Sequence, residues 1–205
     1  MRDLLEDVCG RSVSRETYDK LKAFEGLVRK WTKTINLVSK SSTKDLWARH
    51  ILDSAQLLRY AQPTEGAWVD LGTGGGFPGI VVAILLEEDP RPFYLVESDT
   101  RKAAFLLNAV QNLNLSAQIL PERIENYSGP RAATLSARAL APLHALLDLS
   151  APITEVGGEM LFLKGRSWRE ELTAAQQSWT LKFESHTSRT NAESAVLRIE
   201  RWTRA

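Results

Sequence analysis

The stretch WVDLGTGGGFPG at residues 68–79 decides the expected fold of this chain. A short apolar run ends in Asp70, and five glycines follow within eight positions. Glycines at this density let the backbone turn tightly and approach a bound molecule closely, because they carry no Cβ. The stretch therefore predicts a strand at 67–71, then a ligand-binding loop, and then a helix at 77–89.

Strands and helices alternate along the rest of the chain. The apolar patterns predict further strands at 92–98, 116–120, 132–140, 158–165, 180–187 and 194–202, and helices at 100–115 (with Thr100 as its cap), 142–153 and 167–178. The last two strands follow one another directly and are expected to pair antiparallel. This alternation predicts an α/β fold, a doubly wound and mainly parallel seven-stranded sheet with helices on both faces.

Residues 1–63 are expected to form an N-terminal helical extension packed on the core, and residues 64–205 the main domain. Apolar residues at spacings of three and four predict one helix at 14–33 and a second at 44–60. Between Arg11 and Arg59 there are eleven Lys and Arg against five Asp and Glu. Such a segment is either a nucleic-acid contact surface or a solvated basic helix pair.

The bulk composition indicates one domain of ordinary size, with 205 residues, 43% of them hydrophobic and 25% charged. No apolar run approaches the roughly 20 residues that span a membrane, and the N-terminus lacks a signal pattern, so we expect a cytoplasmic protein without a membrane partner. Cys9 stands alone, which excludes an internal disulfide. His50, His144 and His186 lack metal-ligand spacing, so no metal is expected.

The glycine loop could hold any of several ligands. A Walker triphosphate loop needs a Lys-Ser/Thr pair after its last glycine, and GFPGIVV has none. Gly74, Gly76 and Gly79 match G-x-G-x-x-G, and Glu97 ends the next strand, where an acid accepts hydrogen bonds from the ribose of NAD or of S-adenosylmethionine. Asp70 favours the cationic methyl donor, because a carboxylate beside a pyrophosphate costs free energy. NAD and a turn without ligand stay open.

Six segments, in this order and spacing, resemble the RsmG family, also called GidB: NLVS (36–39), RHILDS (49–54), DLGTGGGFPGI (70–80), LVES…RKAAFL (95–106), SARALAPL (136–143) and LFLKG (161–165). These proteins are bacterial small-subunit ribosomal RNA methyltransferases. The resemblance implies a Rossmann-like class I methyltransferase that uses S-adenosylmethionine. It also implies methyl transfer to N7 of a guanine in 16S rRNA, either naked or in the 30S ribosomal particle, by an enzyme that we expect to be a monomer.

The resemblance also implies which residues contact the cofactor. The loop residues are Gly72, Gly74 and Phe77; Glu97 takes the ribose, with Ser98 and Asp99 beside the adenosine; Ile124 and Glu125 flank the adenine; and Arg138 faces the methyl-transfer cleft. Guanine N7 has a free lone pair and needs no general base, so no catalytic residue is assigned and catalysis rests on positioning. Arg138, Arg123 and Lys164 are candidates to hold guanine O6.

Several of these residues have a structural alternative at this point. Phe77 could be core, Glu125 a solvated helix residue and Lys164 a surface lysine. Asp53 is expected to pair with Arg49, four residues earlier on a helix.

The RNA phosphates would be met by basic side chains of the N-terminal segment, namely Arg29, Lys30, Lys33 and Arg49. The stretch NAESAVLRI departs from the family pattern at Glu193 and Ser194, so a contact there is either missing or supplied by Arg189 or Arg198. Three rival functions stay open: a small-molecule methyltransferase, a nicotinamide dehydrogenase, and an RNA-binding module without catalysis.

Overall fold

The computed structural model describes residues 1–39 and 41–205 of the chain. Within them, seven strands form a single sheet: β1 Trp68–Leu71, β2 Phe93–Val96, β3 Ala117–Leu120, β4 Ala132–Arg138, β5 Thr154–Lys164, β6 Trp179–Thr187 and β7 Ala195–Arg204. The strand order is β3-β2-β1-β4-β5-β7-β6. The first five strands run parallel, and β7 lies antiparallel to both β5 and β6. The predicted fold class and the terminal antiparallel pair are therefore confirmed.

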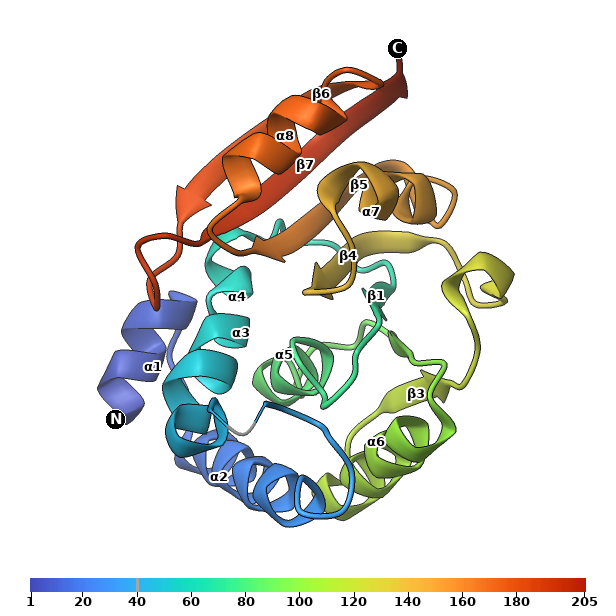
Figure 1. The fold of residues 1–205 in the computed structure, drawn as a ribbon. Coiled ribbons are helices and arrows are strands. Elements are labelled where there is room, and N and C mark those ends of the chain that lie inside the picture. Colours follow the sequence, from blue (N-terminus) through green and yellow to red (C-terminus); the bar gives the residue numbers. More distant parts are fainter. Residues whose placement is uncertain (40) are drawn as a thin grey trace.

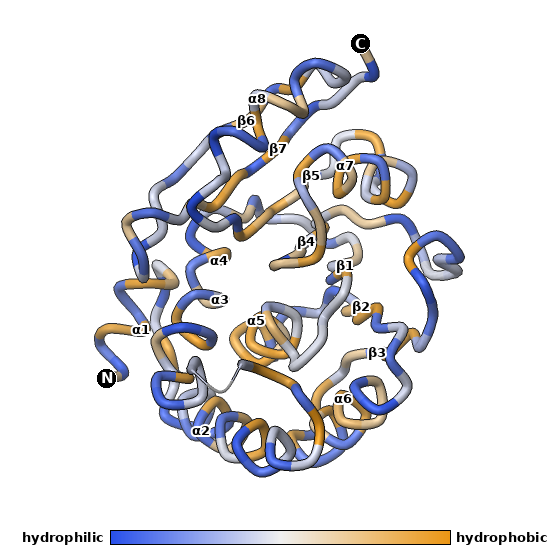
Figure 2. The backbone as a smooth tube through the Cα atoms, viewed as in Figure 1, coloured by the Kyte–Doolittle hydropathy of each residue, from blue (hydrophilic) through white to orange (hydrophobic). Residues whose placement is uncertain are grey.

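Helices cover both faces of this sheet (Figure 1). In chain order they are α1 Arg2–Cys9, α2 Arg15–Trp31, η1 Thr43–Asp45, η2 Trp47–Leu52, α3 Asp53–Ala55, α4 Leu57–Tyr60, α5 Gly79–Leu85, α6 Thr100–Leu113, η3 Ile124–Asn126, α7 Leu143–Ser150 and α8 Trp168–Ala175. The helices from α1 through α6 pack on one face of the sheet in one hydrophobic cluster. The helices α7 and α8 pack on the other face in a second cluster. Figure 2 shows apolar residues along α5, which lies at the centre of the first cluster.

The structure differs from the sequence-based prediction in three elements. The helix α1 was not predicted, although Gly10, with a φ of 75°, ends it in the left-handed conformation that glycine favours. The helix predicted at 44–60 is divided into η1, η2, α3 and α4, and η2 is a π-helix. Asp99 caps α6 in place of Thr100, since its carboxylate accepts hydrogen bonds from the N–H groups of Arg101 and Lys102.

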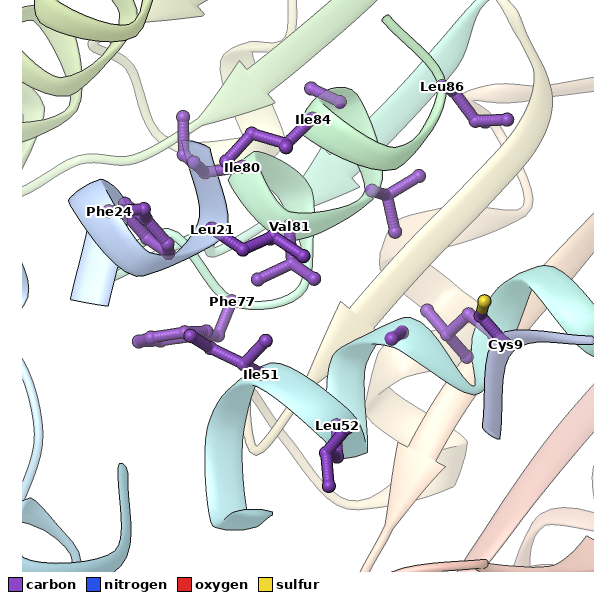
Figure 3. Close-up of a cluster of buried hydrophobic side chains, with 14 of the residues drawn as sticks. Cys9, Leu21, Phe24, Ile51, Leu52, Phe77, Ile80, Val81, Ile84 and Leu86 are labelled. Atoms are coloured by element: carbon purple, nitrogen blue, oxygen red, sulfur yellow. The ribbon is translucent and has the colours of Figure 1, made fainter. Parts of the chain in front are cut away.

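The N-terminal helices share the core of the sheet. Phe24 of α2 is fully buried, with its ring 5.3 Å from that of Phe77 and 6.4 Å from that of Phe105. Figure 3 shows Phe24, Leu21 and Ile51 converging on Phe77 and on Val81 of α5. The division at residue 63 into an extension and a main domain stays a prediction, but the described contacts bury one continuous cluster across it.

Replacing Phe24 by alanine should lower the free energy of unfolding by about 3–5 kcal/mol, because the change leaves a cavity among packed aromatic rings. Urea denaturation followed by tryptophan fluorescence would measure it. Gly26→Ala on the same helix is the control: nothing lies within 4 Å of the added Cβ, so stability should rise by about 0.5–1 kcal/mol. A loss below about 1 kcal/mol for Phe24→Ala would contradict a shared core.

Candidate active site

Asp70 anchors the glycine loop from below. Its side chain is fully buried, and its carboxylate accepts hydrogen bonds from the Gly79 N–H (3.1 Å) and the Ser136 hydroxyl (2.6 Å). The Trp68 indole N–H donates in turn to Ser136 (2.9 Å). Burial raises the pKa of Asp70 to about 6, although its hydrogen bonds oppose the shift. This carboxylate is enclosed beneath the loop and lines neither cavity at this edge of the sheet, so Asp70 can favour a cationic cofactor only through its charge.

The loop above Asp70 has the backbone that its glycines allow. Gly72, Gly74 and Gly76 have φ values of 64°, 58° and 90°, which are unfavourable for residues with a Cβ. A Cβ on Gly72 would lie 2.6 Å from Cδ1 of Leu140, so the space there is closed to a side chain. The loop therefore presents its backbone to the carboxyl end of the sheet.

Glu97, at the end of β2, closes this loop from the side. Its carboxylate accepts hydrogen bonds from the N–H groups of Gly74 (2.9 Å) and Asp99 (2.7 Å). Its side chain is nearly buried and lines a cavity of about 320 Å³ at the carboxyl ends of β1 and β2. In open α/β sheets ligands bind at this edge, where successive crossovers diverge.

Most of the predicted cofactor contacts surround this smaller cavity. The lining includes Gly72, Gly74, Glu97, Ser98, Ile124, Glu125 and the substrate candidate Arg123; sequence reasoning missed Lys102 and Glu122. Three carboxylates against two basic groups leave an excess of negative charge there. This balance suits a cationic ligand, and the glycine backbone leaves room for a close approach. The residues present thus fit S-adenosylmethionine.

Three predicted contacts lie outside this lining: Arg138, which lines a larger cavity nearby, and the pair Phe77 and Asp99. The Asp99 carboxylate caps α6, so it is directed at backbone N–H groups. The Phe77 ring is buried, 4.9 Å from the His50 ring and under the Arg138 guanidinium at 5.3 Å. A contact of any of the three with the cofactor stays a prediction.

A larger cavity of about 790 Å³ lies beside the first one. It is lined by the ends of β4 and β5, by η2 and by residues of the loop between β6 and β7. Ala139 and Leu140 line both cavities and form the wall between them. Ala139 has a φ of 51°, an unusual conformation for a residue with a Cβ, which often marks a functional site.

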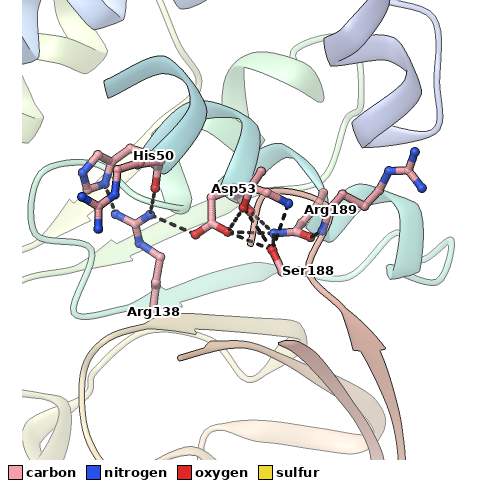
Figure 4. Close-up of polar contacts among 8 residues, drawn as sticks. His50, Asp53, Arg138, Ser188 and Arg189 are labelled. Atoms are coloured by element: carbon pink, nitrogen blue, oxygen red, sulfur yellow. Dashed lines mark hydrogen bonds and ion pairs between the residues drawn. The ribbon is translucent and has the colours of Figure 1, made fainter. Parts of the chain in front are cut away.

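Arg138 lies in this larger cavity and is tied to η2 and α3 (Figure 4). Its Nη1 donates to the Arg49 carbonyl oxygen (3.1 Å) and to Asp53 Oδ2 (3.2 Å), and its Nη2 donates to His50 Nδ1. The predicted pair of Asp53 with Arg49 is therefore wrong. Asp53 instead pairs with Arg138, 85 residues further along the chain.

The protonation of this cluster follows from its burial. Desolvation, together with the charges of Arg138 and Arg49, lowers the pKa of His50 to about 3. His50 is thus neutral at pH 7 and accepts from the guanidinium, which can only donate. Desolvation also lowers the pKa of Arg138, against the opposing attraction of Asp53.

Lys164, at the end of β5, is nearly buried, so the alternative of a surface lysine is wrong. Its ammonium pairs with Glu171 (2.5 Å) and donates to the Ala141 carbonyl oxygen (2.9 Å). Glu171 also accepts from the N–H of Leu143, the first residue of α7. Lys164 therefore braces the 139–142 segment that divides the two cavities.

The basic residues expected to meet RNA lie in different surroundings. Lys30, Lys33 and Arg49 are exposed, and Arg49 lines the larger cavity. The Arg29 guanidinium instead pairs with Glu25 (2.7 Å) and donates to the Thr43 carbonyl oxygen (2.7 Å).

The departure near the last strand also has a structural outcome. Glu193 is exposed and pairs with Arg166 (2.9 Å), while Ser194 lines the larger cavity. Arg189 pairs with Asp7 (2.5 Å). Arg198 is buried against Glu159 (2.7 Å) and lines a different cavity, with Gln62 and Gly158, so it cannot supply the missing contact near Glu193.

The sheet, the glycine loop and the acid at the end of β2 define a Rossmann-like methyltransferase that uses S-adenosylmethionine. The chain belongs to the GidB family, described as rRNA small subunit methyltransferase G, whose model matches residues 17–198.

Its relatives include proteins named ribosomal RNA small subunit methyltransferase G. The one from Ruegeria pomeroyi is 46% identical over 203 residues, covering 98% of this chain and 99% of the relative. The one from Rhodospirillum centenum is 47% identical over 187 residues, covering 91% of this chain and 85% of the relative.

Solved structures show the same fold at low sequence identity. The ribosomal protein L11 methylase from Lactobacillus delbrueckii subsp. bulgaricus matches with a TM-score of 0.59 and 14% identity, covering 75% of this chain and 78% of that one. Magnesium protoporphyrin IX methyltransferase from Synechocystis PCC 6803, with bound SAM, matches with a TM-score of 0.58 and 11% identity, covering 87% and 97%.

Two kinds of feature are absent from the residues that the structure describes, namely a membrane-spanning helix and a metal-binding group. None of the helices outside residue 40 is long and apolar enough to cross a membrane. The same residues contain no group of three or more His, Cys, Asp or Glu placed to hold a metal ion.

Replacing Glu97 by alanine should weaken binding of S-adenosylhomocysteine about 10- to 100-fold. The change removes a charged acceptor from the smaller cavity and frees the Gly74 N–H that it holds, and hydrogen bonds to charged groups contribute about 1.5–3 kcal/mol. Isothermal titration calorimetry measures the dissociation constant. Glu155→Ala, which removes the same charge at the cavity lined by Gln62 and Gly158, is the control and should bind as the wild type does.

Replacing His50 by asparagine should reduce the acid sensitivity of the fold. The pKa of His50 is lower in the folded state than its unfolded value near 6.5, so below pH 6.5 the unfolded state takes up a proton that the folded state does not. Stability is therefore lost as pH falls from 6.5 towards 3. We expect the difference in unfolding free energy between pH 7.5 and pH 5 to shrink by about 1–2 kcal/mol in His50→Asn, as measured by urea denaturation. An unchanged difference would show that His50 is protonated in the folded protein.

Proposed function

We propose that this protein transfers a methyl group from S-adenosylmethionine to N7 of one guanine in 16S rRNA. The observation that carries the proposal is the wall shared by the two cavities, formed by Ala139 and Leu140. A cofactor in the smaller cavity and a nucleotide in the larger one would meet at this wall. The family of the chain and the names of its relatives support an RNA substrate.

The chemistry of this reaction agrees with the groups around the wall. S-adenosylmethionine supplies an electrophilic methyl group, and guanine N7 attacks with its own lone pair, so no residue need remove a proton. The carboxylates that line the larger cavity, Asp53 and Glu171, are each paired with a basic side chain. The protein therefore contributes orientation, which is worth up to roughly 7–11 kcal/mol in favourable systems.

Arg138 is placed to orient the base. Among the contacts of residues 1–39 and 41–205, its Nε–H has no protein partner, while Nη1 and Nη2 are held by η2 and α3. Guanine O6 is an acceptor that arginine commonly binds. Arg138 would hold O6 and leave N7 free for the cofactor.

The target guanine must leave its helix to enter the larger cavity. Side chains cannot reach N7 in the narrow major groove of A-form RNA, so the base must be unpaired or extruded. The exposed Arg49 at the cavity and Lys30 and Lys33 nearby in sequence would meet the phosphates. We further propose that the enzyme acts in the cytoplasm as a monomer, on 16S rRNA or on the 30S particle.

The proposal is tested by incubating the protein with labelled-methyl S-adenosylmethionine and 30S particles from a strain that lacks this gene. Label should appear in 16S rRNA as 7-methylguanosine at a single site. Naked 16S rRNA in parallel identifies the preferred substrate. If the protein binds S-adenosylhomocysteine but labels neither RNA, the RNA substrate is refuted and a small-molecule methyltransferase becomes the leading interpretation.

The salt dependence of substrate affinity also distinguishes an RNA substrate from a small molecule. Each phosphate contact to unpaired RNA should contribute about 0.7 to the slope of log affinity against log salt. Arg49→Ala should therefore lower that slope by about this amount. A small-molecule substrate would give a nearly flat dependence.

A further inference from the structure

One carboxylate joins two walls of the larger cavity. Asp53 Oδ2 pairs with Arg138 at the end of β4, and Oδ1 accepts from Thr190 Oγ1 (2.8 Å) in the loop between β6 and β7. The Asp53 side chain is only 18% exposed and that of Arg138 only 16%, so solvent screens their attraction weakly. Figure 4 shows Asp53 between Arg138 and Ser188.

The loop between β6 and β7 depends on this contact together with two others. Gln56 accepts from the Arg189 N–H (2.9 Å) and donates to Ser188 Oγ (3.0 Å), and the same Gln56 amide donates to Asp53 Oδ1 (2.8 Å). From outside, Asp7 holds the Arg189 guanidinium. Ser188 and Thr190 line the larger cavity, so the position of the loop sets its width.

Arg138 without Asp53 would keep only neutral partners on its Nη atoms. These are the Arg49 carbonyl oxygen and His50 Nδ1, and each accepts one hydrogen bond from the guanidinium. The Asp53 carboxylate adds an ion pair with the guanidinium, which the two neutral acceptors do not provide. Asp53 therefore decides which way the remaining Nε–H of Arg138 points.

We propose that Asp53 is a positioning residue that orients Arg138 and the 188–194 loop toward a purine base in the larger cavity. The inference rests on the proposed function, since it assigns the larger cavity to the target nucleotide. It predicts that Asp53 acts on the methyl-transfer step through Arg138 and leaves the cofactor cavity unaffected.

The test is Asp53→Asn, which keeps the shape and the Oδ1 acceptor but replaces the charge facing Arg138. With 30S particles as substrate, kcat should fall about 10- to 100-fold, while the dissociation constant for S-adenosylhomocysteine stays within twofold of the wild type. Asp89→Asn is the matched control, because the same chemical change removes a partly buried carboxylate that pairs with an arginine, Arg91 (2.9 Å), and that lines neither cavity. Its kcat should stay within twofold.

Combining the Asp53 and Arg138 variants tests whether Asp53 acts through Arg138 or supports the structure in general. If Asp53 acts through Arg138, then Asp53→Asn combined with Arg138→Ala should be no slower than Arg138→Ala alone. A further tenfold loss in the double variant would overturn the proposal, as would a change in S-adenosylhomocysteine affinity with unchanged kcat.

If Asp53→Asn does not fold, Arg138→Ala decides instead, because Asp53 is then intact. The proposal requires that variant to bind S-adenosylhomocysteine normally and to lose kcat, and normal kcat would refute it. The wild-type protein in the same assay distinguishes a failure of the proposed function from a failure of the proposed role of Asp53. Absence of RNA labelling by the wild type refutes the proposed function, whereas normal labelling by Asp53→Asn refutes only the role of Asp53.

Discussion

The buried carboxylate of Asp70 is the constraint on which the rest of the site depends. It joins three elements at once, because Asp70 belongs to β1, accepts from the first N–H of α5 and accepts from Ser136 of β4. The approach of α5 is so close that a Cβ on Gly79 would lie 2.7 Å from Asp70 Oδ2 and 2.5 Å from Leu95. With α5 fixed in this way, the chain from Gly72 to Gly79 must close as a tight loop, and the Gly74 N–H of this loop donates to Glu97 at the cavity.

A second constraint runs through the N-terminal helices. They bury the Phe77 ring between Phe24 and His50, and they bring Asp53 to the end of β4. The cofactor loop and the larger cavity are therefore positioned by one packed cluster. The N-terminal helices are therefore part of the site. The charge distribution of the sequence alone also allowed them to be a solvated basic helix pair outside it.

Sequence reasoning could predict what depends on local pattern and on the geometry of parallel sheets. Glu97 was predicted at the cavity because carboxyl ends of neighbouring strands meet at one edge. The Asp53–Arg138 pair was not predictable, because it joins residues 85 apart through a π-helical turn that no local pattern indicated. The local alternative, Arg49 four residues before Asp53, satisfies the rule for an α-helix, but Arg49 is not on an α-helix here. The burial of Lys164 was not predictable for the same reason, since it depends on Glu171 of a later helix.

The shifted pKa values of Asp70 and His50 have opposite effects on how stability depends on pH. The pKa of Asp70 is raised from near 3.8 to about 6, so between these values the folded state binds a proton more tightly than the unfolded state, and stability falls as pH rises. The pKa of His50 is lowered, so stability rises with pH over an overlapping window. The two slopes partly cancel between pH 4 and pH 6. Above pH 6.5, Asp70 is mainly ionised and His50 is neutral. The Gly79 N–H then donates to a charged carboxylate, and Arg138 donates to a neutral imidazole.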